Sequence, residues 1–149
     1  MKTIIADRYH DISCGHRVVG HESKCRFIHG HNYRVHFRCE GPRDDIGRVL
    51  DFSVMKAKLC MWLEDNWDHR FLAFVEDSLL GNIMARRLPE DDAAILIESV
   101  VWVPFTPTAE NMADYLLTVI GPRLLEGTGV KLVSVRIEET RKCSAEVSL

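Results

Sequence analysis

The chain lacks a cysteine framework, a long apolar run and a strong net charge. Its five cysteines are an odd number without regular spacing, which argues against a disulfide-stabilised extracellular fold. The apolar run 100–105 is far too short to span a membrane, and residues 1–8 lack the charged and apolar blocks of a secretory signal. A net charge of −3 gives no reason to expect nucleic acid. We therefore expect a cytoplasmic protein with neither a membrane nor a nucleic-acid partner.

Repeats, linkers and low-complexity segments are also missing from the sequence. A chain of 149 residues with 46% hydrophobic and 28% charged residues has the composition of a soluble globular protein with a sizeable core. We therefore expect residues 1–149 to form a single domain.

Hydrophobic patterns predict an α+β domain in which two strands precede, and two strands follow, a pair of long helices. The clearest strand places Tyr33 to Cys39 alternately on one face, and a later strand does the same with Val133, Val135 and Ile137. Asp51 or Ser53 is expected to cap the first long helix and Thr108 the second. The expected elements are strands at 3–13 and 31–40, helices at 51–66, 78–88 and 108–126, an extended stretch at 95–103, and strands at 133–138 and 144–149.

Five of the seven histidines fall between His16 and His36, and this clustering suggests a metal site. In an extended chain residues i and i+2 point to the same side, so His29 and His31 present two imidazoles together. His16 reaches the same point if the two strands pair as a hairpin. Three neutral imidazoles with an open fourth position are typical of a catalytic zinc site. Two surface histidines on a polar strand face remain the simpler alternative, and His21 and His36 fit that description.

Cys25 lies four residues before His29 and admits three interpretations. As a fourth zinc ligand it would make the site structural. As a buried thiol it would be inert, although its neighbours Lys24 and Arg26 argue against this. Those two cations, together with a nearby metal, favour the thiolate and therefore a reactive base or nucleophile.

Two carboxylate motifs near predicted element ends complete the candidate chemistry. Asp68 and His69 stand at a helix exit, where the chain can fold a carboxylate onto an imidazole for acid/base work. A helix-end ion pair is the alternative. In Glu138-Glu139-Thr140, one glutamate of an alternating strand faces the core side and needs N–H donors, which a ligand could supply. A solvated strand end is the alternative.

In their order along the chain, these motifs resemble the 6-pyruvoyl-tetrahydropterin synthase / 6-carboxy-tetrahydropterin synthase family. The resemblance covers nearly the whole chain, and it is the combination of motifs that makes it specific. The motifs are His16, Cys25-x-x-x-His29-Gly30-His31, Asp51-Phe52, Asp68-His69, Pro107-Thr108-x-Glu110 and Glu139-Thr140.

The resemblance implies a T-fold (tunnelling fold), a ββααββ subunit with an antiparallel sheet and two long helices on one face. It implies a homohexamer built as a dimer of trimers, with active sites between subunits. It also implies Zn²⁺ held by His16, His29 and His31, and 7,8-dihydroneopterin triphosphate as the substrate.

Residue roles follow from the same resemblance. Cys25 corresponds to the general base, and Asp68 with His69 to the partner in proton transfer. Glu139 corresponds to the anchor of the pterin ring, with Thr108 and Glu110 near the ring pocket. The chain departs from the family pattern at Cys14-Gly15, in a long connector at about 75–98, and in the tail 141–145, which lacks an aromatic residue.

The activity favoured by the resemblance is that of a zinc-dependent lyase forming 6-carboxy-5,6,7,8-tetrahydropterin, with loss of acetaldehyde and triphosphate, for queuosine (7-deazaguanine) synthesis. The alternative is a 6-pyruvoyl-tetrahydropterin synthase that releases triphosphate only. A non-catalytic zinc- or pterin-binding T-fold protein, in which Cys25 closes the metal shell, is a further possibility. A GTP cyclohydrolase-like hydrolase is the most remote.

Overall fold

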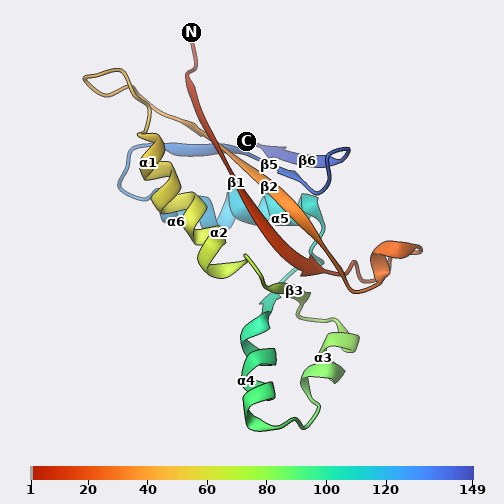
Figure 1. The fold of residues 1–149 in the computed structure, drawn as a ribbon. Coiled ribbons are helices and arrows are strands. Elements are labelled where there is room, and N and C mark those ends of the chain that lie inside the picture. Colours follow the sequence, from red (N-terminus) through yellow and green to blue (C-terminus); the bar gives the residue numbers. More distant parts are fainter. Residues whose placement is uncertain (1) are drawn as a thin grey trace.

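A curled, mixed sheet of six strands organises residues 2–149, the part of the chain that the computed structural model describes (Figure 1). Its strand order is β4-β3-β1-β2-β5-β6. Strands β1, β2, β5 and β6 pair in that order, each antiparallel to the next, and this part agrees with the antiparallel sheet that the family resemblance implies. Their bounds are β1 Ile5–His16, β2 His29–Glu40, β5 Lys131–Glu138 and β6 Ser144–Ser148.

The pairing of β1 with β2 determines which side chains meet at the end of the hairpin. It runs without a break from Ile5 opposite Glu40 to His16 opposite His29. Cys14 is therefore the partner of His31. This pair and the His16–His29 pair alternate in phase with the buried face of the sheet, whereas Ile5 and Glu40 lie on the other face. The predicted hairpin is confirmed, and its register brings His16 to the strand end that carries the other two imidazoles.

Two short parallel strands extend the sheet beyond β1. Strand β3 (Phe71–Phe74) pairs with β1 at Gly15, and β4 (Val100–Val103) pairs with β3 along its whole length. A Cβ at position 15 would lie 2.7 Å from Cδ2 of Phe71, so glycine permits this close approach. Because parallel neighbours need a long crossover, the connector between them carries two helices, α3 (Ser78–Met84) and α4 (Glu90–Ser99).

Helix α4 corrects the predicted extended stretch 95–103. Only Val100–Val103 is a strand, whereas the preceding five residues are helical. Pro89 stands at the N-cap, and three acidic residues, Glu90, Asp91 and Asp92, occupy the positive first turn. These helix-start signals outweigh the β-branched composition of the segment.

Two long helices contribute the side chains that pack against the sheet, and each contains a π-helical segment. Asp51 caps the first, accepting from Ser53 N at 2.8 Å, and Thr108 caps the second, accepting from Asn111 N at 3.2 Å. Both predicted caps are therefore confirmed. In Figure 1 α5 and α6 lie behind the sheet. The segments are α1 (Phe52–Met55), the π turn Lys56–Cys60 and α2 (Met61–Asn66), then α5 (Ala109–Tyr115), the π turn Leu116–Ile120 and α6 (Gly121–Leu124).

The core lies between these helices and the inner face of the sheet. The predicted inward residues of β2 are all buried, as are Val135 and Ile137 of β5. Val133 is the exception, because a bulge between Arg38 and Cys39 shifts the register and buries Leu132 in its place.

Gly121, the first residue of α6, lies against Leu132 of β5 with no room for a side chain. A Cβ there would overlap Cδ2 of Leu132 and lie 2.9 Å from the carbonyl oxygen of Leu116. Gly121→Ala should therefore destabilise the protein by about 1–3 kcal/mol through overpacking. Gly81→Ala, in helix α3 with open space around the position, is the matched control and should stabilise the protein by about 0.5–1 kcal/mol. Urea denaturation measures both, and equal effects would contradict the packing argument.

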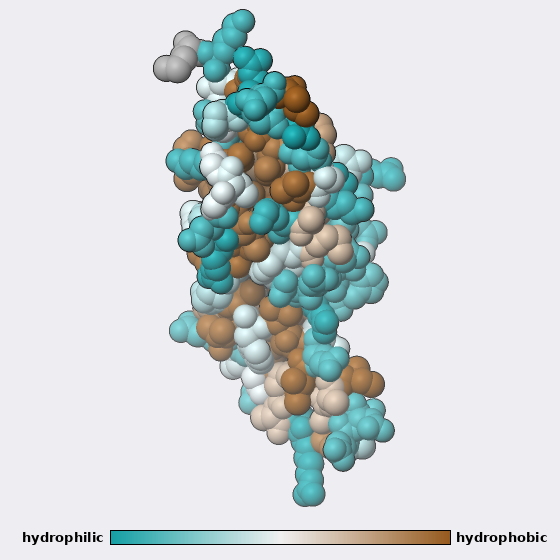
Figure 2. Space-filling model, turned by 90° about the vertical axis from the view of Figure 1, so that its left-hand side faces the viewer, coloured by the Kyte–Doolittle hydropathy of each residue, from teal (hydrophilic) through white to brown (hydrophobic). Residues whose placement is uncertain are grey.

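The connector helices leave apolar side chains exposed. Ile95 and Ile97 of α4 are 66% and 65% exposed, and no residue of this helix is buried. Figure 2 shows apolar surface between hydrophilic side chains along the side that faces left in Figure 1. Within residues 2–149, no helix combines the length and the apolar character needed to cross a membrane.

Candidate metal and substrate site

Three histidines converge where the β1–β2 hairpin ends. His16 is the last residue of β1, and His29 and His31 begin β2 on the same face. One ring nitrogen from each lies within 4.8 Å of the others, and Nε2 of His16 is 3.1 Å from Nε2 of His29. The predicted histidine triad (His16, His29, His31) is therefore assembled within one chain and could hold a metal ion.

Backbone carbonyls orient two of the three rings. His16 donates from Nδ1 to the carbonyl oxygen of Pro107, and His29 donates from Nδ1 to that of Phe27, both at 2.6 Å. These bonds place the ring proton on Nδ1 and leave Nε2 as a free lone pair, the arrangement common among metal-binding histidines. Sequence reasoning missed both carbonyls, because every residue has a backbone oxygen and residue type does not single one out; Pro107 is in addition 91 residues from His16.

The third ring supplies a buried nitrogen without a partner. Nε2 of His31 lies 3.3 Å from Oε1 of Glu139 but forms no hydrogen bond with any described residue. Burial lowers the pKa of His16 and of His31, so both rings are neutral at pH 7. Neutral imidazoles with free lone pairs fit a divalent metal such as zinc. A bound metal ion would also give the buried Nε2 of His31 the partner that it lacks.

Cys25 lies in a 3₁₀ turn, Lys24–Arg26, between the two strands. Its side chain is partly buried, and its carbonyl oxygen accepts a hydrogen bond from Val18 N at 2.8 Å. In residues 2–149 the group that could hold a metal consists of the three histidines without this cysteine. The thiol is therefore outside the group that could hold a metal, whereas the sequence had left open a place within the metal shell.

Asp68 and His69 form a bonded pair at the end of the first long helix. His69 adopts the left-handed conformation (φ 59°), which turns the chain so that its Nδ1 lies 2.7 Å from Oδ2 of Asp68. The other carboxylate oxygen accepts from Ser13 N at 2.9 Å. Burial pushes the pKa of Asp68 upward, but the bonds from Ser13 and His69 outweigh it and leave the pKa below its usual value. The pair is therefore a carboxylate holding an exposed imidazole.

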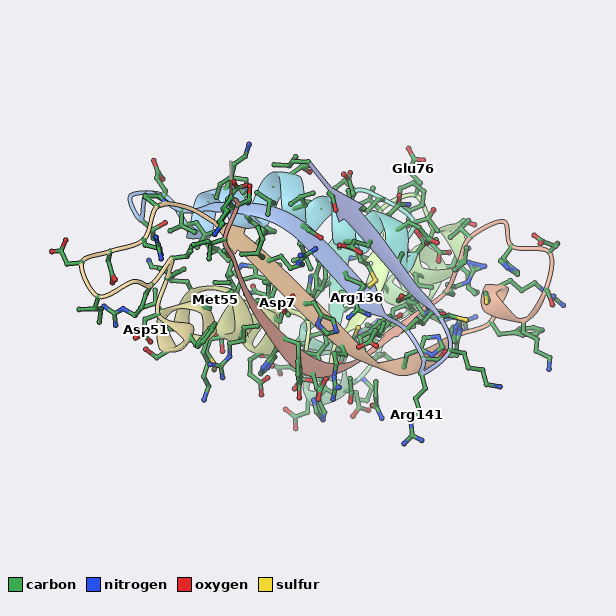
Figure 3. The ribbon with its side chains drawn as sticks, turned by 90° about the horizontal axis from the view of Figure 1, so that it is seen from above. Asp7, Asp51, Met55, Glu76, Arg136 and Arg141 are labelled. Carbon is green, nitrogen blue, oxygen red and sulfur yellow. The ribbon has the colours of Figure 1, made fainter. Side chains whose placement is uncertain are left out.

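A cavity of about 900 Å³ connects the pair with one end of the triad. His16, His29 and Cys25 are not among its lining residues, and neither are Thr108 and Glu110. Thr108 follows the carbonyl that binds His16, whereas Glu110 is exposed. Figure 3 shows Arg141 projecting outward from the ribbon. The cavity is lined in part by His31, Tyr33, Asp68, His69, Glu139 and Arg141.

Tyr33 is a buried side chain that sequence reasoning assigned only to the core. Its ring packs edge-on against His16 and His31, with centroid distances of 5.9 and 5.5 Å. Its hydroxyl is buried without a hydrogen-bond partner among the described residues. Burial, and then the charges of nearby groups including Glu139 and Cys25, raise the pKa of Tyr33, so the hydroxyl stays protonated. Its position two residues after His31 on one strand face was the available signal.

Known protein families include one that matches nearly the whole chain. The model of the family described as 6-pyruvoyl tetrahydropterin synthase matches residues 5–149. A protein of Rickettsia typhi named 6-carboxy-5,6,7,8-tetrahydropterin synthase is 30% identical over 138 residues, which cover 92% of this chain and 94% of that protein.

Solved structures show the same fold. An uncharacterized protein of Wolinella succinogenes, WS1659, superposes with a TM-score of 0.83 at 27% identity, and the match covers 99% of each chain. The 6-pyruvoyl tetrahydropterin synthase of Caenorhabditis elegans superposes with a TM-score of 0.66 at 22% identity, covering 100% of this chain and 97% of that one. At that identity the second likeness concerns the fold alone.

Proposed function

Because the chain belongs to the 6-pyruvoyl tetrahydropterin synthase family, has its T-fold and is a lyase of the tetrahydropterin synthase kind, we propose that it makes 6-carboxy-5,6,7,8-tetrahydropterin. The substrate in this proposal is 7,8-dihydroneopterin triphosphate, which takes up one water and loses acetaldehyde and triphosphate. Full-length relatives that bear this name support it. The observation that carries it is the histidine triad, a group of three imidazoles that could hold a metal and that does not include the thiol of Cys25. The product would serve queuosine (7-deazaguanine) synthesis in the cytoplasm, a compartment that suits five unpaired cysteines.

The proposed cofactor is zinc, held by His16, His29 and His31. Nε2 of His16 and Nε2 of His29 lie 3.1 Å apart. Within residues 2–149 the group that could hold the ion contains three imidazoles and neither a cysteine nor a carboxylate, which fits an open site better than a closed structural shell. When bound, zinc supplies a Lewis acid that polarises oxygens of the substrate side chain.

The proton transfers fall to side chains of the chain itself. In the proposal Cys25 Sγ removes a proton from a side-chain carbon of the substrate. The bond from His69 Nδ1 to Asp68 leaves Nε2 of His69 free to exchange a proton with a substrate hydroxyl. Glu139 accepts hydrogen bonds from N–H groups of the pterin ring, for which a carboxylate at the cavity wall is suited. Thr108 and Glu110 would lie near the ring.

A complete site requires a second subunit in this proposal. The cavity of Asp68 and His69 does not include Cys25 among its lining residues, which supports the proposal that the base and its partner in proton transfer come from different subunits. An assembly of identical chains, proposed as a hexamer of two trimers, would bring the Cys25 of one subunit to the Asp68–His69 pair of another. The exposed imidazole of His69, 81% accessible, is available for such a contact.

The test is incubation of the zinc-loaded protein with 7,8-dihydroneopterin triphosphate, followed by mass analysis. We expect carboxy-tetrahydropterin with one equivalent each of acetaldehyde and triphosphate. A reaction without enzyme corrects for spontaneous decay. Pyruvoyl-tetrahydropterin with triphosphate alone would support the alternative activity, that of a 6-pyruvoyl tetrahydropterin synthase, which is the description of the matching family. Unchanged substrate would contradict both activities.

A further inference from the structure

A buried ion pair lies outside the groups that the proposed reaction uses. Arg17 Nη1 is 3.1 Å from Oδ2 of Asp77, and the two side chains are only 15% and 2% exposed. Arg17 directly follows the metal-site residue His16, whereas Asp77 belongs to the long connector between β3 and β4. Sixty residues of sequence separate the partners.

Asp77 is held in place from the other side. Its Oδ1 accepts hydrogen bonds from Leu79 N at 3.0 Å and from Leu80 N at 3.4 Å, which makes it the N-cap of α3. Both carboxylate oxygens are therefore engaged, one with the connector helix and one with Arg17. The bonds from α3 fix the position of the carboxylate, and the carboxylate orients the guanidinium of Arg17.

The guanidinium of Arg17 also forms a hydrogen bond with the 3₁₀ turn that carries Cys25. Arg17 Nε donates to the carbonyl oxygen of Arg26 at 3.0 Å, while Val18 N donates to that of Cys25 at 2.8 Å. Two consecutive residues after His16 thus bind the carbonyls of Cys25 and of the residue that follows it. One of these bonds depends on a backbone N–H, and the other depends on the orientation of a side chain.

We propose that Arg17, oriented by Asp77, is a positioning residue that fixes the turn carrying Cys25 relative to the strand end that carries His16. The planar guanidinium offers two donors in fixed geometry, one to the carboxylate and one to the turn. A lysine ammonium at this position is a point charge that cannot make both bonds in this geometry. The connector helices then have a role in the site, because α3 presents the carboxylate that orients Arg17. The catalytic part of this inference rests on the proposed function.

Simple capping of α3 is the competing explanation, and two substitutions separate the roles. Asp77→Ser keeps an N-cap oxygen, since serine caps about as well as aspartate, but removes the partner of Arg17. Arg17→Lys keeps the cap and the positive charge but loses the second donor. If the pair only stabilises the connector, Asp77→Ser leaves the turn unchanged.

The matched controls are also present in the chain. Glu76→Ser changes the exposed carboxylate that precedes Asp77 in the chain. The side chain of Glu76 points outward in Figure 3. Arg48→Lys changes an exposed arginine that pairs with Asp44 and Asp51, away from the triad. All variants are made in the Cys143→Ser background, because Cys143 is the exposed thiol that would compete with Cys25 for alkylation.

The first measurement is the rate of Cys25 alkylation by iodoacetamide, located by peptide mass mapping, with zinc content and thermal midpoint recorded for each variant. We expect Arg17→Lys and Asp77→Ser to change the alkylation rate at least about threefold with one zinc retained. The second measurement is kcat, expected to fall about 10- to 100-fold with KM nearly unchanged, because misplacement of a reacting group by about 1 Å has that effect. The double variant should be no worse than the worse single variant.

Wild-type alkylation rates in folded Arg17→Lys and Asp77→Ser would overturn the inference. So would equal effects from the two control substitutions. If the wild type does not turn over the pterin substrate, the proposed function fails while the alkylation rates still decide the positioning role. If Asp77→Ser does not fold, Arg17→Lys, which leaves the helix cap in place, decides it.

Discussion

Cys25→Ala is expected to reduce turnover of 7,8-dihydroneopterin triphosphate by about 10²- to 10⁴-fold, the range typical for loss of a general base. Zinc content should stay at that of the wild type, because the group that could hold the metal consists of the three histidines. The thermal midpoint should change little, since the thiol is only partly buried and lies in a short turn. Steady-state kinetics, metal analysis and a melting curve measure the three quantities on one preparation.

Cys143→Ala is the control for this prediction. Its thiol is exposed in the turn between β5 and β6, so the substitution should leave kcat and zinc content unchanged. Loss of zinc together with melting of Cys25→Ala would show that the thiolate closes a structural metal shell. The protein would then be a binding protein, and its catalytic assignment would be wrong.

His31→Ala is expected to lower zinc affinity by at least about 100-fold, because even the loss of an outer partner of a metal ligand costs 10- to 100-fold. The substitution suits the test, because Nε2 of His31 forms no hydrogen bond that the fold would lose. Removal of His16 would instead leave the Pro107 carbonyl without its donor and would confuse the two effects. Turnover should fall with the metal.

Stability measurements should show the same loss. Zinc at 100 times its dissociation constant stabilises the wild type by about 2.7 kcal/mol relative to the chelated protein. At the same zinc concentration the His31→Ala protein should gain at most about 0.4 kcal/mol, so its melting temperature should hardly differ with and without zinc. Melting curves recorded in zinc and in a chelator, with metal analysis of the dialysed protein, measure this.

His36→Ala is the matched control on the same strand. His36 lies on the opposite face of β2, where its Nε2 is 2.9 Å from Oε2 of Glu138. It does not belong to the histidine triad. It should keep wild-type zinc content and the zinc-dependent rise in melting temperature. Full zinc content in His31→Ala, or equal losses in the two variants, would rule out the proposed metal site.

Errors of sequence interpretation in this chain have local physical causes. The run Ile95–Val103 contains many β-branched residues, yet its first half is helical, because the acidic first turn and Pro89 begin a helix upstream. The bulge opposite Arg38 exchanges Val133 for Leu132 in the core, and strict alternation does not foresee it. Both errors concern competing local preferences, and neither moves a predicted site residue.

Local pattern alone determined the strand that carries His29 and His31, both helix caps, and the bonded Asp68–His69 pair at a helix exit. These features depend on residues close in sequence, where a period of two or a capping side chain acts directly. The combination of motifs was also sufficient to indicate the family. The family match confirms this, whereas the individual residue roles remain predictions.

Tertiary structure decided the contacts between residues that are far apart in the sequence. It set the register that brings His16 to His29, and it placed the carbonyl of Pro107 and the carboxylate of Asp77 against the residues around the triad. It also added β3 and β4 to the sheet through the connector helices. Such contacts join residues up to 91 positions apart, and their partners are a backbone oxygen or one carboxylate among many. Nothing in their residue type distinguishes them until packing of the whole chain brings them together.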